Sequence, residues 1–139
     1  MVTWVEAPAE LPVRHRALVK LPIIATLLTQ GRDGPMLAAV WYEWARGGIS
    51  CSIPPDGVLA RNVRRNPRVA LLIAGADRPY CGIEYRGEAR LDDDYVPVLR
   101  RLARRYLGEG ADAEYLVGHP PNRHLRMEHG RFRLWDDAA

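Results

Sequence analysis

Residues 59–72 of this chain read Leu-Ala-Arg-Asn-Val-Arg-Arg-Asn-Pro-Arg-Val-Ala-Leu-Leu, an amphipathic helical turn that runs into a buried strand. Leu59 and Val63 are four residues apart, so they share one face of a helix. Pro67 ends that helix, because proline has no backbone N–H with which to continue it. The apolar run from Val69 to Ile73 has the composition of a strand that is covered on both faces.

The rest of the chain predicts further short elements, read from apolar periodicity and turn residues. Helices are expected at Val13–Leu21, Val58–Asn66, Tyr95–Tyr106 and Ala113–Val117. Strands are expected at Ile23–Gln30, Met36–Ala45, Ile49–Ile53, Arg68–Ala74, Tyr80–Leu91, Arg123–Glu128 and Arg131–Trp135, the last two as a hairpin. Antiparallel strands in this number usually avoid bare edges by closing into a barrel.

The best helical pattern, at 95–106, follows three consecutive acids, Asp92, Asp93 and Asp94. Carboxylates at that position satisfy free amides and the positive end of the helix dipole. We therefore expect all three to cap and stabilise the long helix.

Length and composition indicate one domain over residues 1–139, with an irregular N-terminal arm over 1–12. The net charge is +3, which does not by itself imply nucleic acid. Cys51 and Cys81 lie among apolar neighbours, as reduced core thiols of a cytoplasmic protein do. The start of the chain has no signal-peptide pattern, and no segment has the apolar length of a membrane span.

The order strand, turn, helix and strand, with Arg61-Asn62 on the helix and Asn-Pro-Arg-Val at 66–69, resembles the pyridoxamine 5'-phosphate oxidase-like split-barrel flavoproteins. The nearest branch is the one that uses the deazaflavin coenzyme F-420. Tyr-Leu-Gly at 106–108 and Leu-Trp-Asp at 134–136 belong to the same resemblance. The expected fold is mainly β with α (α+β): a six- to seven-stranded antiparallel split β-barrel with one long and two or three short helices.

In that family, FMN or F-420 lies between the two subunits of a homodimer. A helix holds its phosphate in the pattern Ser-Arg-Lys-x-Arg-Asn. The matching segment here is 57–62, in which Gly57, Val58 and Leu59 stand at the serine, arginine and lysine positions. The resemblance implies cofactor contacts from Trp41, Ser52, Ile53, Leu59, Arg61, Asn62 and Trp135.

The implied activity is that of an FMN- or F-420-dependent oxidoreductase, which transfers hydride to or from a small organic substrate. No nucleophile elbow, Walker loop or zinc spacing suggests catalysis by side chains alone. Because Leu37, Val58 and Leu59 are apolar, the alternative is a cofactor-free protein that binds a small apolar ligand in the former flavin cleft.

Two further readings are disfavoured by the residue pattern. The arginine groups could form a nucleic-acid patch, but they lack interleaved aromatic residues and acids surround them. Three histidines recur every five residues, at His119, His124 and His129. This spacing does not place them on one face of a helix or a strand. We therefore expect neither nucleic-acid binding nor a metal site.

Overall fold

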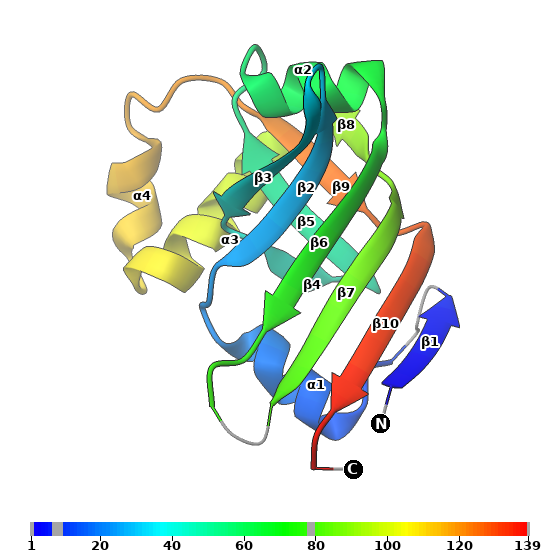
Figure 1. The fold of residues 1–139 in the computed structure, drawn as a ribbon. Coiled ribbons are helices and arrows are strands. Elements are labelled where there is room, and N and C mark those ends of the chain that lie inside the picture. The colour runs from blue at the N-terminus through cyan, green and yellow to red at the C-terminus, as the bar shows by residue number, and fades with distance from the viewer. Residues whose placement is uncertain (1, 7–9, 78–79, 139) are drawn as a thin grey trace.

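The computed structural model describes residues 2–6, 10–77 and 80–138, which fold into two antiparallel sheets with helices around them (Figure 1). The larger sheet has the order β1-β10-β7-β6-β2-β3, with bounds Val2–Glu6, Gly130–Asp136, Cys81–Glu88, Arg68–Ala74, Ala25–Gly31 and Gly34–Val40. The smaller sheet has the order β4-β5-β9-β8, with bounds Glu43–Ala45, Gly48–Ile53, Arg123–Met127 and Arg90–Asp92.

The four helices lie at the ends and on one side of the sheets, and the front face of the larger sheet carries none of them (Figure 1). Their bounds are Val13–Lys20 (α1), Val58–Arg65 (α2), Tyr95–Leu107 (α3) and Ala111–Leu116 (α4). One long helix and three short ones agree with the expected α+β split barrel. None of the helices in the described residues is long and apolar enough to cross a membrane.

The core lies between the inner faces of the two sheets. Leu27, Leu71, Ile83 and Phe132 of the larger sheet are buried there, together with Ile49 and Leu125 of the smaller sheet. Along β6 and β10 these buried residues alternate with exposed or half-buried ones, as expected when one face packs on a core.

Three expectations about the strands are wrong, because the chain passes from one sheet to the other at places that the sequence does not mark. Two expected strands are each divided between the sheets, and one expected hairpin does not form. The expected strand Met36–Ala45 breaks at Tyr42, whose N–H donates to the Tyr106 hydroxyl at 3.1 Å. The expected strand Tyr80–Leu91 breaks at Ala89, which is buried and donates its N–H to the Pro67 carbonyl at 2.9 Å. The last two strands do not pair as a hairpin, since β9 joins the smaller sheet and β10 the larger.

The N-terminal arm also differs from the expectation. Residues 2–6 form β1, which pairs with β10 from Val2↔Trp135 to Glu6↔Arg131. Residues 1 and 7–9 of the expected arm lie outside the described residues. This strand and the two split strands raise the number of strands in the described part of the chain to ten.

The three acids before the long helix do not cap it. Asp94 occupies the N-cap position of α3, but its side chain makes no capping hydrogen bond. Its Oδ1 lies 2.9 Å from Nδ1 of His124. Asp92 pairs with Arg90, and Asp93 with Arg123, at 2.9 and 3.0 Å. The acids bind side chains of the smaller sheet, which the local sequence pattern does not reveal.

Candidate functional site: an aromatic groove and an arginine pocket

An aromatic groove opens where the C-terminal ends of β3 and β5 approach the start of α2 and the segment after α4. It consists of two adjoining cavities of about 240 and 700 Å³. Ser52, Pro54, Tyr115 and Asn122 line both of them. These volumes are of the size that small-molecule sites have.

Aromatic rings form one wall of this groove. Trp41 stacks on Tyr106, with ring centroids 4.9 Å apart and planes within 7°. Its centroid also lies 5.8 Å from that of Tyr115, whose ring is in turn 5.1 Å from that of His119. The Tyr106 hydroxyl donates to the Ile23 carbonyl at 2.7 Å, so the ring that supports Trp41 is itself held in place.

The polar part of the groove is small. Asn122 donates from Nδ2 to Oγ of Ser52 at 2.9 Å, which joins the segment after α4 to β5. Ile53 and Leu59 supply apolar surface next to this pair. Flat apolar surface with one or two placed polar groups is the usual lining of a site for an organic ring.

A second cavity, the arginine pocket, has a volume of about 600 Å³ and lies between the β2–β3 turn and α2. Its basic residues are Arg32, Arg61 and Arg65. Arg61 donates from Nη1 to the Asp56 carbonyl at 2.7 Å. Arg65 donates from Nη2 to the Gln30 carbonyl at 3.1 Å, so both guanidinium groups are anchored by neutral acceptors.

Asn62 has a mainly structural position beside this pocket. It is buried, and its Nδ2 donates to Oγ1 of Thr29 on β2 at 3.0 Å. Its Oδ1 accepts from Arg65 at 3.0 Å. Both ends of the amide are therefore used within the fold, which ties α2 to the larger sheet.

The residues expected to contact a cofactor thus fall into three places. Trp41, Ser52, Ile53 and Leu59 line the aromatic groove. Arg61 and Asn62 line the arginine pocket.

Trp135 lies on β10, which β7, β6 and β2 separate from β3 within the chain. Its ring covers Gly82, where an added Cβ would come within 1.9 Å of it. In this single chain, Trp135 is therefore not part of the groove.

Sequence reasoning missed three residues that line the groove, Tyr115, His119 and Asn122, and also Tyr106, whose ring supports Trp41. Tyr106 ends the helix expected at Tyr95–Tyr106, and that expectation does not reveal its stacking on Trp41. Tyr115 and Asn122 carry no motif in the sequence. Only the packing of the segment 111–122 against β3 and β5 brings them to this place.

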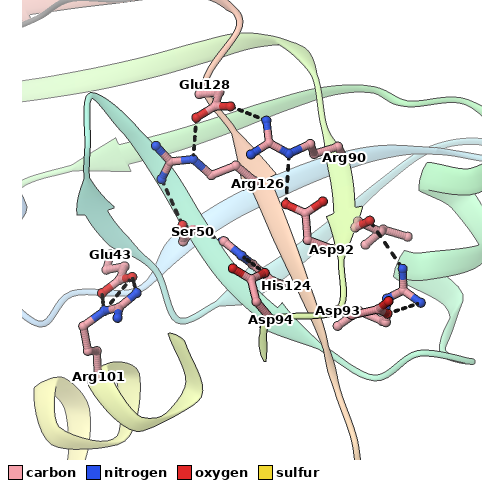
Figure 2. Close-up of polar contacts among 12 residues, drawn as sticks. Glu43, Ser50, Arg90, Asp92, Asp93, Asp94, Arg101, His124, Arg126 and Glu128 are labelled. Carbon is pink, nitrogen blue, oxygen red and sulfur yellow. Dashed lines mark hydrogen bonds and ion pairs between the residues drawn. The ribbon is translucent and has the colours of Figure 1, made fainter. Parts of the chain in front are cut away.

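A buried polar network lies on the smaller sheet, shown in Figure 2. His124 sits between Asp94, at 2.9 Å from Nδ1, and Ser50, whose Oγ is 2.8 Å from Nε2. The hydrogen bond to His124 is the main reason that the pKa of Asp94 lies below its ordinary value. The connectivity is that of a Ser-His-Asp triad, but Ser50 has no exposed surface and cannot meet a substrate.

Arg126 completes this network as a buried cation. It donates to Ser50 Oγ at 3.0 Å, to the Arg46 carbonyl at 3.1 Å and to Glu128 at 2.9 Å. Glu128 also pairs with Arg90, and hydrogen bonds from Arg90 and then Arg126 lower the pKa of Glu128 to about 2 (Figure 2). A buried charge with three partners is satisfied, so this network holds the smaller sheet together.

Asp92, Asp94 and His124 also have potential metal-ligand atoms within 4.8 Å of one another. Arg90 and His124 already occupy the carboxylates of this cluster. It therefore belongs to the polar network.

Comparison with solved structures agrees with the fold. No protein-family model matches the chain, and no curated protein matches it. A conserved hypothetical protein from Mycobacterium tuberculosis superposes with a TM-score of 0.75 and 26% identity, over 93% of this chain and 87% of that one.

Two further structures are described by activity. An F-420 reductase gives a TM-score of 0.70 at 23% identity, over 88% of this chain and 98% of the other. A Listeria innocua protein provisionally described as a pyridoxamine 5'-phosphate oxidase gives 0.68 at 16%, over 87% and 94%. This chain therefore has the split-barrel fold of the pyridoxamine 5'-phosphate oxidase-like proteins.

Proposed function

We propose that this protein is an FMN- or F-420-dependent oxidoreductase that binds the cofactor ring in the aromatic groove. The observation that carries the proposal is the groove itself, in which Trp41, Ser52 and Asn122 combine a fixed aromatic wall with one polar pair. A ring bound there would supply hydride transfer to or from a small organic substrate. The side chains would orient the ring and shape the space beside it.

Two candidate nucleophiles near the groove, Cys51 and Ser50, are buried in the structure. The Cys51 thiol is fully buried, and burial raises its pKa to about 12, so it stays protonated. Ser50 is buried within the polar network. Redox chemistry by a bound organic cofactor therefore fits the groove better than nucleophilic catalysis does.

The uncovered face of the larger sheet supports a homodimer as part of this proposal. Leu37 and Leu72 are exposed there, and Leu37 has 68% of its surface accessible. On the other half of the same face, Arg86 and Arg131 lie over the ring of Trp4 at 5.0 and 4.4 Å. A second copy that covers this face would also be able to bring its Trp135 toward the groove.

Binding titrations test the function. Purified protein is titrated with FMN and with F-420, and the cofactor fluorescence is followed. We expect saturable binding of one of them, and weakening by about tenfold in Trp41→Leu. Trp44→Leu is the matched control, because Trp44 packs on Phe132 away from the groove.

The outcome separates the proposed function from its alternative. If neither cofactor binds the wild type, the cofactor-free reading replaces it. The apolar side chains of Leu37, Val58 and Leu59 favour that reading, and a small apolar fluorescent probe such as ANS would then bind the groove in a Trp41-dependent way. Light scattering tests the dimer, which should persist at micromolar concentration and bury more than ~1,600 Å².

A further inference from the structure

We propose that a cavity beside α1, the α1 pocket, binds a small organic carboxylate with an apolar body. The pocket has a volume of about 410 Å³ and is lined by side chains of the segment 10–20, by Trp44 of β4 and by Arg105 of α3. Among the described residues it shares no lining side chain with the aromatic groove. α1 also lies at the opposite end of the molecule from α2 (Figure 1), so the pocket is a second site, separate from the one in the proposed function.

Three apolar side chains form one wall of the α1 pocket. Leu11 and Val19 are buried, and Trp44 joins them from β4. The ring of Trp44 packs edge-on against that of Phe132, with centroids 5.4 Å apart, which fixes its orientation. A fixed indole ring beside two aliphatic side chains offers a surface to a hydrocarbon ring or a short chain.

Arg105 supplies a cation that the fold holds in place without neutralising it. Its Nη2 donates to the Leu21 carbonyl at 2.6 Å, and its guanidinium lies 4.9 and 5.5 Å from the ring centroids of Tyr42 and Tyr106. The Nε–H is buried and has no hydrogen-bond partner within the described residues. A carbonyl and two rings leave the positive charge in place, and part of the donor capacity of Arg105 stays unused.

The other charged groups of the pocket keep its balance positive. Arg16 pairs with Glu10 at 2.9 Å, so these two charges offset each other. Lys20 is the only lysine of the chain, and it has no carboxylate partner in the part of the chain that the structure describes. Lys20 and Arg105 therefore leave two positive charges beside an apolar wall.

This combination selects the class of ligand. A carboxylate accepts charge-assisted hydrogen bonds from an arginine, and two unneutralised cations favour an anion over a neutral molecule. An inorganic anion would leave the apolar wall uncovered, whereas an organic acid would cover it. A small carboxylate with a ring or a short chain satisfies both parts of the pocket.

The test compares 2-naphthoate with 2-naphthamide, which have the same ring system but a charged and a neutral head group. Both are titrated by calorimetry into the wild type, Arg105→Gln, Lys20→Gln and Trp41→Leu. Arg104→Gln is the matched control, because Arg104 is the neighbour of Arg105 on α3 but pairs with Asp112 outside the pocket.

We expect the wild type to bind one naphthoate, at least about tenfold more tightly than naphthamide. Arg105→Gln should lose about tenfold in affinity for naphthoate, and Lys20→Gln about threefold, because the exposed Lys20 is screened by solvent and salt. Arg104→Gln and Trp41→Leu should bind naphthoate as the wild type does. Lys20→Gln changes an exposed side chain, so it keeps the test decisive if melting curves show that Arg105→Gln is unstable.

Three results would overturn the inference: equal affinity for the acid and the amide, no binding of naphthoate at millimolar concentration, or a preference that survives in both pocket variants. A loss of binding in Trp41→Leu but not in Arg105→Gln would overturn it too, because it would place naphthoate in the aromatic groove. The cofactor titrations test the proposed function with other ligands at other residues, so either proposal can fail while the other holds.

Discussion

The ion pairs of Glu128 make the free energy of unfolding depend on pH, and substituting this one residue removes that dependence. Glu128 accepts from the buried Arg126 and pairs with Arg90, and these contacts lower its pKa from the ordinary 4.5 to about 2. Because the folded state binds this proton less tightly than the unfolded chain, acid favours unfolding. The contribution is complete above about pH 5 and is lost as the pH falls toward 2.

The magnitude follows from that shift. Each tenfold change in proton affinity corresponds to about 1.4 kcal/mol, which sets a ceiling of about 3 kcal/mol for Glu128. Arg90 is half exposed, so solvent and salt weaken its share of the interaction. We therefore expect the carboxylate to stabilise the folded state by about 1–2 kcal/mol at pH 7.

The assay is urea unfolding of the wild type and of Glu128→Gln at a series of pH values from 7 to 2. The variant should be less stable by about 1–2 kcal/mol at pH 7, since glutamine leaves the buried Arg126 without its counter-charge. The difference should shrink steadily below about pH 5 and be mostly lost at pH 2, where about half of the folded wild-type carboxyl is protonated. Glu109→Gln is the control, because Glu109 lies exposed in the turn after α3 and makes no ion pair within the described residues.

Two results would refute this reasoning. The first is a stability difference between the wild type and Glu128→Gln that stays constant from pH 7 to pH 2. The second is an equal effect of Glu109→Gln, which would assign the acid sensitivity to overall charge and not to the pairs with Arg90 and Arg126.

Three shorter predictions concern packing and burial. Gly82→Ala should destabilise the protein by about 1–3 kcal/mol in urea unfolding, because its new Cβ would overlap the ring of Trp135, and Trp135→Ala in the same chain should relieve part of that cost. Asn62→Ala should lower the free energy of unfolding by about 1–3 kcal/mol, because it removes the hydrogen bond from Asn62 to the buried Thr29 hydroxyl that joins α2 to β2. An unfolding midpoint equal to that of the wild type would contradict this role. A thiol reagent should modify neither Cys51 nor Cys81 in the native protein and both of them in urea, whereas rapid native labelling of Cys51 would show that its site opens.

Much of the local structure was predictable because it depends on neighbours in sequence. The spacing of Leu59 and Val63, and the stop at Pro67, predicted the helix and strand that the structure has at Val58–Arg65 and Arg68–Ala74. These features depend on side-chain periodicity and on proline geometry, both of which act over a few residues. The family resemblance was visible in the same stretch, and the solved structures confirm the fold that it implied.

The composition of the site was less predictable. Trp41, Ser52 and Leu59 were named from the resemblance, and the structure places them around one groove. That Arg61 lines a different cavity depends on the side of α2 from which its side chain leaves the helix. That Tyr115 completes the groove depends on how a segment more than 60 residues further along the chain packs against β5.

The amino-acid sequence by itself therefore determined where helices and strands form after residue 12 and which of their faces are apolar, whereas β1 at Val2–Glu6 depends on its pairing with β10. Tertiary structure alone decided where strands change sheets, as at Tyr42 and Ala89, and which partners the acids find. Asp94 shows the difference, since its position before a helix predicts a cap but its side chain binds His124 instead. A helix cap contributes about 1 kcal/mol to stability, and a hydrogen bond to a buried group on a distant strand can outweigh it.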